Sequence, residues 1–196
     1  MNCLVVAATA LEIAPFLELF RGSEYPGRSG QNTDILVTGV GLSATTYSLT
    51  KQIAIKVPDL IIQVGLAGCF DKKIPLGTVM AVKQEAIADQ GAEDRGRFKD
   101  IFDLNLTHPN RHPYTRGWLV NNSDILKKVR LKKVRGISVN EISSSPKKIN
   151  LYKKKLNPVV ESMEGAALHY VSLMEQVPFI QLRGISNYVG ERNKKF

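Results

Sequence analysis

The chain has 196 residues, of which 43% are hydrophobic, and it carries a formal net charge of +9. This length suits one domain with a sizeable core and excludes two ordinary domains. The two cysteines, Cys3 and Cys69, each lie in or beside an apolar run, which favours buried thiols in a reducing compartment over a disulfide framework. No apolar stretch has the length of a membrane span, and the N-terminus lacks the features of a signal peptide. We therefore expect a single, soluble, cytoplasmic domain over residues 1–196, with no membrane partner.

Lysine-rich runs carry much of the positive charge. They fall at 127–135, 147–148, 153–155 and 194–195. A basic chain can bind nucleic acid, but apart from Tyr152 these runs have no aromatic residues at stacking spacing, and no nucleic-acid module is recognisable. We interpret the runs as a solvated basic face and expect no nucleic-acid partner.

Apolar runs alternate with segments of helical spacing along the chain. Strands are predicted at 2–8, 34–39, 59–65, 78–88, 134–139, 157–162 and 178–186, and helices at 12–22, 42–57 and 163–177. Several strands are nearly continuous runs of Val, Ile and Leu, as expected where both faces of a sheet are covered. The pattern predicts a three-layer α/β domain with a central mixed, largely parallel sheet flanked by helices.

The alternation also predicts where a ligand binds. In such sheets the ligand crevice lies beyond the carboxyl ends of the strands. This rule points to the loops at 9–12, 39–41, 65–69 and 186–188. Residues 89–116 form a long polar segment, and segments of this kind are often binding loops.

The sequence GVGLSA at 39–44 fits a permissive dinucleotide fingerprint between a strand and a helix. The acid expected about 20 residues later would be Asp59, which begins its strand where the fingerprint requires an acid at the end. We therefore assign Gly39 and Gly41 to a tight strand-to-helix turn.

Glu12 has two interpretations. Thr9 and Glu12 have the spacing of a capping box. With Thr9 as N-cap, however, Pro15 would fall at the sixth helical position, where it removes a hydrogen bond and its ring clashes. We expect the helix to begin at or after Ile13, which places Pro15 in the first turn and leaves Glu12 to point into the crevice.

The segment ESMEGAALHYV at 161–171 places Glu164 in the first turn of the last helix, where the helix dipole favours an ionised carboxylate. Such a group can bind sugar hydroxyls, and an ordinary helix-start acid is the alternative. For His169 we expect packing, because no spacing of His, Cys or Asp provides the partners of a metal site. We expect neither a metal nor an organic cofactor.

Four segments together resemble one family over nearly the whole chain. The N-terminal strand followed by Glu12, and the sequences VGLAG (64–68), VVESMEGAA (159–167) and LRGISNYV (182–189), resemble the nucleoside phosphorylase superfamily. Within it they resemble the hydrolases that cleave methylthioadenosine and futalosine, and the last two segments resemble the futalosine hydrolases of menaquinone biosynthesis. The phosphorylases carry an early Gly-Asp-Pro-x-Arg segment where this chain has ALEIAPF, so the resemblance implies that water is the nucleophile.

The resemblance implies a role for each matching residue. Cleavage of an N-glycosidic bond builds positive charge on the ribose and negative charge on the departing base. Glu12 matches the base that activates water, Arg183 matches an arginine that holds this water, and Glu164 matches the carboxylate that binds the ribose hydroxyls. The implied substrate-binding residues are Met163, Ser186, Glu141, Ile142, Gly65, Ala67 and Gly68.

Asn187 departs from the adenine-releasing nucleosidases, which carry an aspartate that protonates purine N7. An amide cannot deliver this proton, but it can donate one hydrogen bond and accept another. It therefore suits hypoxanthine, with a chain turn as the alternative. Glu141 falls in the family's base-binding loop and would accept the N1–H of hypoxanthine, with a solvated glutamate as the alternative.

Two further departures limit the resemblance. Leu66 replaces a serine common in methylthioadenosine nucleosidases, and the chain ends at Phe196 where the family continues into a C-terminal helix, so we expect this helix to be missing from the sequence. The predicted function is hydrolysis of futalosine to hypoxanthine and dehypoxanthine futalosine by a homo-oligomer, with a dimer favoured. The alternatives are a methylthioadenosine or S-adenosylhomocysteine nucleosidase and a nucleoside-binding protein without turnover.

Overall fold

The computed structural model describes residues 1–22 and 32–191. All seven predicted strands and all three predicted helices are present in it. The strands are β1 (Asn2–Ala7), β2 (Asn32–Val37), β3 (Leu60–Cys69), β4 (Val79–Ile87), β9 (Lys133–Ser138), β10 (Val160–Ser162) and β11 (Phe179–Tyr188), and the helices are α1 (Ala10–Gly22), α2 (Leu42–Ile55) and α5 (Gly165–Met174). The structure adds β5 (Gly91–Asp94), β6 (Arg97–Asp100), β7 (Tyr114–Thr115), β8 (Trp118–Val120), α3 (Asp124–Lys128) and α4 (Pro146–Leu156).

Nine of the described strands form one mixed sheet in the order β2-β1-β3-β10-β9-β4-β8-β7, and β11 pairs with both β3 and β4. The pairs β1–β2, β1–β3, β3–β11, β4–β9 and β9–β10 are parallel, and the other four pairs of this sheet are antiparallel. Because β11 joins β3 to β4, strands β3, β10, β9, β4 and β11 close into a ring. The predicted class, a mixed sheet flanked by helices, is confirmed, and the ring is an addition that the strand pattern did not predict.

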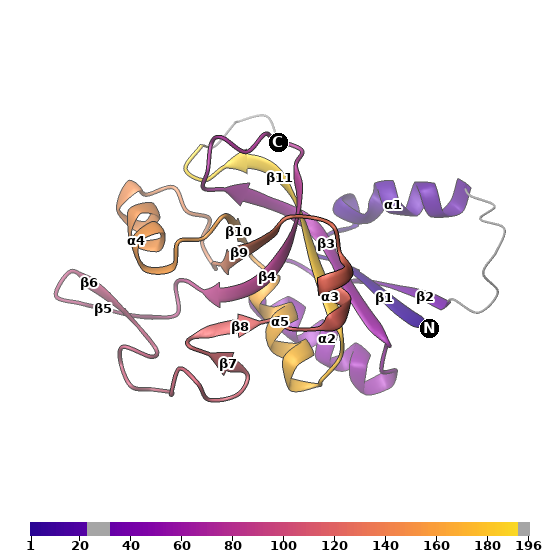
Figure 1. Cartoon of the computed structure of the whole chain (residues 1–196), viewed down its shortest axis with the longest axis horizontal. Helices are drawn as coiled ribbons and strands as arrows, with labels where there is room; N and C mark the ends of the chain where they lie inside the picture. Colours follow the sequence, from indigo (N-terminus) through magenta and orange to yellow (C-terminus); the bar gives the residue numbers. More distant parts are fainter. Residues whose placement is uncertain (23–31, 192–196) are drawn as a thin grey trace.

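Alternating residues of β1 show how the helices cover both faces of the sheet. Val6 packs with Leu49 of α2 and Leu168 of α5. Val5 points to the other face and packs with Ile13 of α1. Successive side chains of a strand point to opposite faces, so α1 lies on one face and α2 with α5 on the other, as Figure 1 shows.

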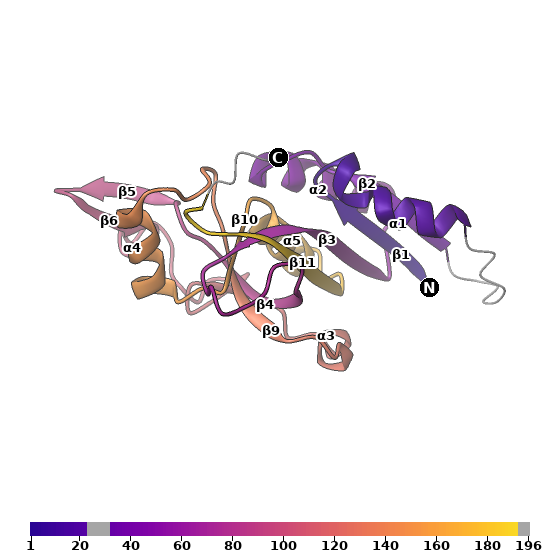
Figure 2. The same cartoon turned by 90° about the horizontal axis from the view of Figure 1, so that it is seen from above.

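The polar segment 89–116 contains more regular structure than its composition suggested. Strands β5 and β6 pair as an antiparallel hairpin, and β7 pairs with β8 at the edge of the main sheet. In both Figure 1 and Figure 2 the β5–β6 hairpin projects away from the body of the molecule.

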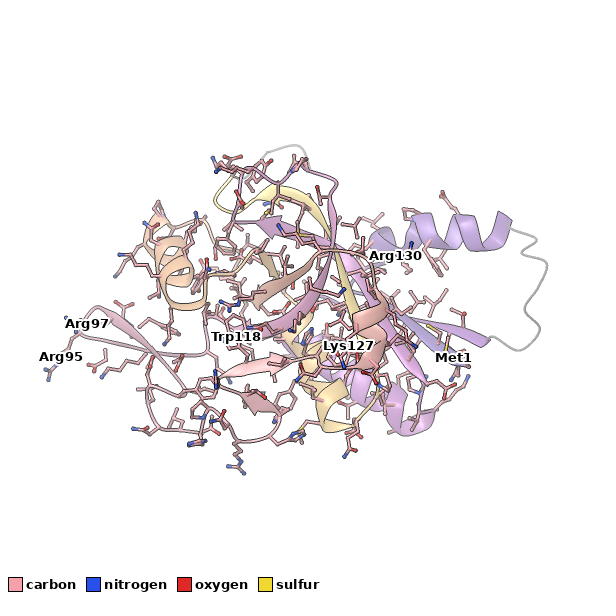
Figure 3. The ribbon with its side chains drawn as sticks, viewed as in Figure 1. Met1, Arg95, Arg97, Trp118, Lys127 and Arg130 are labelled. Carbon is pink, nitrogen blue, oxygen red and sulfur yellow. The ribbon has the colours of Figure 1, made fainter. Side chains whose placement is uncertain are left out.

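The basic runs occupy separate elements. Lys127 belongs to α3, whereas the lysines at 147–148 and 153–155 belong to α4. Figure 3 shows Lys127 and Arg130 together near α3, and Arg95 and Arg97 far from them at the tip of the β5–β6 hairpin. Several of these lysines are paired with acids, as Lys155 is with Asp100. None of the described helices combines the length and the apolar character needed to cross a membrane.

Candidate active site

A cavity of about 230 Å³ lies where the sheet rule predicted a crevice, beyond the carboxyl ends of β1 and β10 and against the last residues of β3 and β11. Eight predicted site residues line it: Glu12, Ala67, Gly68, Ile142, Met163, Glu164, Ser186 and Asn187. Arg183 and Gly65 lie directly behind them, and Arg183 contacts the backbone of Leu66, which lines the cavity. The fold therefore gathers residues that are up to 175 positions apart in the sequence, from Glu12 to Asn187.

Glu12 is both a helix cap and a cavity residue. The Glu12 N–H donates to Thr9 Oγ1 (3.3 Å), and the Thr9 N–H donates to Glu12 Oε2 (3.2 Å), which is the reciprocal pattern of a capping box. The helix begins at Ala10, so the expectation of a start at or after Ile13 was wrong, and Pro15 lies inside it. The proline leaves the Leu11 carbonyl without its helical donor, and Leu11 is 86% exposed, so water can replace that bond.

The second carboxylate oxygen of Glu12 faces the end of β3. Glu12 Oε1 accepts a hydrogen bond from the Leu66 N–H (3.0 Å). The Leu66 carbonyl accepts one from Arg183 Nη1 (3.5 Å). The backbone of Leu66 thus connects the acid to the arginine.

Arg183 is fully buried, with 1% of its side chain exposed, and Gly65 makes room for it. A Cβ added at Gly65 would lie 2.4 Å from Arg183 Nη1 and 3.1 Å from Glu12 Oε1. Arg183 Nη2 donates to Gln63 Oε1 (2.9 Å) and lies 3.7 Å from Glu164 Oε2. Gln63 and the Leu66 carbonyl fix the position of the guanidinium. It therefore lies between Glu12 and Glu164, the two acids of the site.

Glu164 is the N-cap residue of α5, one position before the predicted first turn. Its Oε1 accepts a hydrogen bond from the Gly41 N–H (3.1 Å). Gly41 has a φ of +92° and Gly39 a φ of +85°, which confirms that the glycines of GVGLSA form a turn between β2 and α2. This turn, which resembles a dinucleotide fingerprint in sequence, holds the carboxylate of Glu164 through the Gly41 N–H.

A β-bulge at Ser186 directs Asn187 into the cavity. The pairing of β11 with β3 shifts between Ile185 and Asn187, so that Asn187 is opposite Gly68. In a regular strand Asn187 would share the face of Ile185, which is 2% exposed and lies in the core. The extra residue turns the amide to the other face.

Two hydrogen bonds orient the Asn187 amide. Ser186 Oγ donates to Asn187 Oδ1 (2.9 Å), and Asn187 Nδ2 donates to the Tyr188 carbonyl (3.2 Å). A carbonyl can only accept, so it fixes which end of the amide is the NH₂ group. One N–H and one lone pair of the amide remain for a ligand.

Glu141 does not belong to this group. It is exposed, forms an ion pair with Lys148, and does not line the cavity. Lys148 lowers the pKa of the Glu141 carboxyl, as expected for a surface pair. The adjacent residue Ile142 does line the cavity, so the loop reaches the site but Glu141 points away from it.

Glu161 is a cavity residue that the sequence reasoning missed. It is 6% exposed, and its Oε1 accepts a hydrogen bond from the Ser143 N–H (3.0 Å). Burial raises the pKa of the Glu161 carboxyl, the bonds from Ser143 oppose this, and the charge of Asp89 adds to it. Glu161 is the first residue of the ESMEG sequence and lies in the predicted strand 157–162, which was the available signal, but an isolated glutamate in a sequence does not reveal its burial.

A second group of polar side chains lies in the closed interior. Glu85 and Gln181 are fully buried, and Gln181 Nε2 donates to Glu85 Oε1 (2.9 Å) while Ser138 Oγ donates to Glu85 Oε2 (3.2 Å). Burial raises the pKa of Glu85 to about 7, against the smaller effects of Gln181 and Arg183. Burial lowers the pKa of His169 to about 4, and its Nδ1 bonds the Leu119 carbonyl (3.0 Å), so His169 is a neutral core residue.

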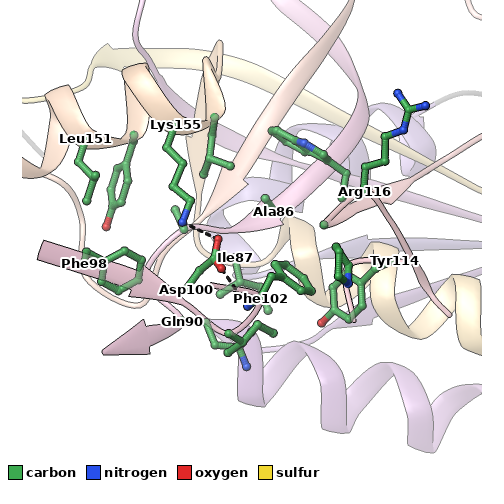
Figure 4. A pocket seen from close by; sticks show the side chains of 17 residues that line it. Ala86, Ile87, Gln90, Phe98, Asp100, Phe102, Tyr114, Arg116, Leu151 and Lys155 are labelled. Atoms are coloured by element: carbon green, nitrogen blue, oxygen red, sulfur yellow. Dashed lines mark hydrogen bonds and ion pairs between the residues drawn. The ribbon is translucent and has the colours of Figure 1, made fainter. Parts of the chain in front are cut away.

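A second cavity, of about 240 Å³, lies between α4 and the segment 98–118. Figure 4 shows Phe98, Phe102 and Tyr114 around it, with Lys155 bonded to Asp100. The polar segment 89–116, predicted as a binding loop, contributes to its lining, whereas none of the catalytic and substrate-binding residues implied by the resemblance does. Within residues 1–22 and 32–191, no cluster of His, Cys, Asp and Glu side chains has the arrangement of a metal site.

The chain is similar to known proteins over nearly its whole length. The profile of the family described as "Phosphorylase superfamily" matches residues 5–196. The futalosine hydrolase of Thermus thermophilus is 28% identical over 97% of this chain and 85% of its own length, and that of Streptomyces coelicolor is 26% identical over 99% and 87%.

Solved structures show the same fold at lower identity. The 5′-methylthioadenosine/S-adenosylhomocysteine nucleosidase of Campylobacter jejuni has a TM-score of 0.79 and 18% identity, over 100% of this chain and 90% of that one. The futalosine hydrolase of Helicobacter pylori has a TM-score of 0.76 and 19% identity, over 96% and 85%. With a family match over nearly its whole length and the site described above, the chain belongs to the phosphorylase superfamily.

Proposed function

We propose that this protein hydrolyses the N-glycosidic bond of futalosine, releasing hypoxanthine and dehypoxanthine futalosine in menaquinone biosynthesis. The similarity to two futalosine hydrolases over nearly the full chain supports the coarser assignment, an N-glycosyl hydrolase of the nucleosidase type. The observation that carries the finer assignment is the oriented Asn187 amide in the same cavity as Glu12 and Glu164.

In this proposal Glu12 is the general base. A water molecule beside Glu12 attacks C1′ of the ribose and passes its proton to the carboxylate as the C1′–N9 bond breaks. The Leu66 N–H bonded to Glu12 Oε1 fixes the carboxylate in place. The Arg183 guanidinium lies behind Gly65, on the same side as Glu12 Oε1. Its positive charge helps to hold the water beside Glu12.

Glu164 binds the ribose hydroxyls as an acceptor. Its negative charge also stabilises the positive charge that develops on the sugar as the bond breaks. The Gly41 N–H and Arg183 hold this carboxylate from two sides. Met163, which precedes it and lines the cavity, packs against the sugar.

Asn187 binds the departing base. The electron pair of the C1′–N9 bond passes to the purine, Asn187 Nδ2–H donates to the 6-oxo oxygen, and Asn187 Oδ1 accepts from N7–H once N7 has taken up a proton. The base takes its proton from solvent. An amide matches a 6-oxopurine, whereas adenine release in related nucleosidases uses an acid at this place.

The experiment that tests this proposal measures the bases released from futalosine and from methylthioadenosine in phosphate-free buffer. We expect hypoxanthine from futalosine and little adenine from methylthioadenosine. Adenine as the main product would favour a methylthioadenosine nucleosidase, the fold neighbour with a TM-score of 0.79. Tight binding of futalosine without release of a base would favour a nucleoside-binding protein instead.

A further inference from the structure

Serines of two neighbouring strands cap the first turn of α5. The Gly165 N–H donates to Ser162 Oγ of β10 (3.3 Å), and the Ala166 N–H donates to Ser138 Oγ of β9 (2.8 Å). The first N–H groups of a helix have no partner within the helix itself. The two serine hydroxyls therefore supply acceptors that the start of α5 requires.

The N-cap residue of a helix ordinarily supplies such a bond itself. Its side chain accepts from the N–H group two or three positions later. Glu164 is the N-cap residue of α5, and Ala166 is two positions later. In α5, which is described from end to end, the Glu164 side chain nevertheless makes no capping bond. Ser138 accepts from Ala166 instead, and Glu164 Oε1 is bonded to the Gly41 N–H at the cavity.

The Ser138 hydroxyl is held in its place by Glu85. Ser138 is fully buried and donates its hydrogen to Glu85 Oε2 (3.2 Å). A hydroxyl has one hydrogen and two lone pairs, so this bond leaves the lone pairs for donors such as the Ala166 N–H. Glu85 itself has no room to move, because a Cβ added at Gly165 or at Gly136 would overlap its Oε1. The start of α5 therefore rests directly on Glu85 and Ser138.

From these contacts we infer that Ser138 is a positioning residue, which caps α5 in place of Glu164 and so keeps the Glu164 carboxylate free to bind the ribose hydroxyls. The inference rests on the proposed function, which gives Glu164 this ligand. Without the Ser138 hydroxyl the buried Ala166 N–H loses its acceptor, and an unpaired buried donor is costly. The Glu164 carboxylate is a charged acceptor at the N-cap position, so it turns from Gly41 toward its own helix.

The test compares kcat/KM for futalosine with kcat/KM for its 2′-deoxy analogue, which lacks one of the hydroxyls that Glu164 binds. In Ser138→Ala the ratio of the two values should fall by at least about 5-fold from that of the wild-type enzyme, because a displaced carboxylate distinguishes the two substrates less. The intrinsic reactivities of the two nucleosides are the same in both enzymes and cancel.

Ser172→Ala is the matched control and should leave this ratio unchanged. Ser172 is a buried serine of the same helix, and its hydroxyl has no hydrogen-bond partner among the described residues. A purely structural role for Ser138 would change kcat/KM for both substrates by the same factor. An unchanged ratio in Ser138→Ala would therefore overturn the inference.

The crystal structure of Ser138→Ala without a ligand tests the inference independently of any substrate. We expect Glu164 to leave the Gly41 N–H and to accept a hydrogen bond from the Ala166 N–H. A carboxylate that remains on the Gly41 N–H would show that Ser138 does not position Glu164.

The outcomes separate this inference from the proposed function. If the wild-type enzyme releases no hypoxanthine from futalosine, the proposed function fails, and the position of Glu164 in the crystal structure of the variant still decides the role of Ser138. If it releases hypoxanthine but the ratio is unchanged in Ser138→Ala, only the role of Ser138 fails. Should Ser138→Ala not fold, Ser138→Cys replaces it. A thiol is a weaker acceptor than a hydroxyl, so the ratio should again fall, by a smaller factor, and an unchanged ratio would again contradict the inference.

Discussion

The open cavity and the closed interior of this protein both contain glutamates, but the groups that bind these glutamates differ. In the cavity, Glu12 and Glu164 accept hydrogen bonds from backbone N–H groups and flank Arg183. In the interior, Glu85 accepts hydrogen bonds from the neutral side chains of Gln181 and Ser138 and has no opening to solvent. Burial raises the pKa of the Glu85 carboxyl to about 7, which favours its protonated form. We therefore expect cavity substitutions to change turnover and, apart from Ser138, interior substitutions to change stability.

The largest expected effect is the loss of turnover in Glu12→Gln. Glutamine can serve in the capping box but cannot accept the proton of the attacking water, so kcat should fall by about 10³-fold while the melting temperature changes little. Base release and thermal unfolding measure the two quantities. Glu18→Gln, an exposed position on the same helix, is the control and should match the wild-type enzyme in both. A Glu12→Gln variant with full activity would show that Glu12 only caps α1.

Gly65→Ala should lower kcat/KM by about 100-fold, because its methyl group would overlap Arg183 Nη1 and shift the arginine by a fraction of an ångström or more. The same substitution at Gly184 is the control, since a Cβ there would meet only Leu66 Cδ2 at 3.8 Å, an ordinary contact. Kinetics of both variants with futalosine measure the difference. Equal activity of the two would contradict the position assigned to Arg183.

In the interior, Glu85 and His169 should have opposite effects on stability. The pKa of Glu85 is raised to about 7 from 4.5, so the folded chain holds a proton that the unfolded chain has lost, and the free energy of unfolding falls as pH rises from 4.5 to 7. The pKa of His169 is lowered to about 4 from 6.5, so the unfolded chain binds the extra proton, and the free energy of unfolding rises as pH rises from 4 to 6.5. Each contribution is about 3 kcal/mol, and the two oppose each other over the shared range.

Single variants should separate the contributions of Glu85 and His169 to the pH dependence of stability. In Glu85→Gln the free energy of unfolding should rise with pH between 4.5 and 6.5, and in His169→Gln it should fall over that range. Denaturant titrations at several pH values measure these slopes. Identical slopes in the two variants would show that the pair does not set the pH dependence of stability.

The smallest expected effect is that of Ser186→Ala. This change removes one hydrogen bond to Asn187 Oδ1, while the bond to the Tyr188 carbonyl still orients the amide. A neutral hydrogen bond contributes about 1 kcal/mol, so kcat/KM for futalosine should fall by roughly 5-fold. Ser186→Thr keeps the hydroxyl and serves as the control. A loss as large as that of Glu12→Gln would give Ser186 a direct role in the chemistry.

The sequence alone determined the elements with strong local signals and the motifs beside them. Continuous apolar runs identified all seven predicted strands, because burial on both faces leaves a pattern within a few residues. Helix α4 escaped notice because only Tyr152 of its residues is buried, although Ser145 and Pro146 carry an N-terminal signal. The family motifs placed most of the expected site residues at one cavity, since strand ends converge at one edge of a sheet.

Tertiary structure decided which way the side chains of these motifs point. The bulge at Ser186 turns Asn187 toward the cavity, and its register with Gly68 depends on a strand more than 110 residues away. Glu141 and Glu161 are both acids near the loop that contains Ile142, yet one pairs with Lys148 in solvent and the other is buried in the cavity wall. These differences arise from pairing and packing between distant segments, and local periodicity contains no information about such contacts.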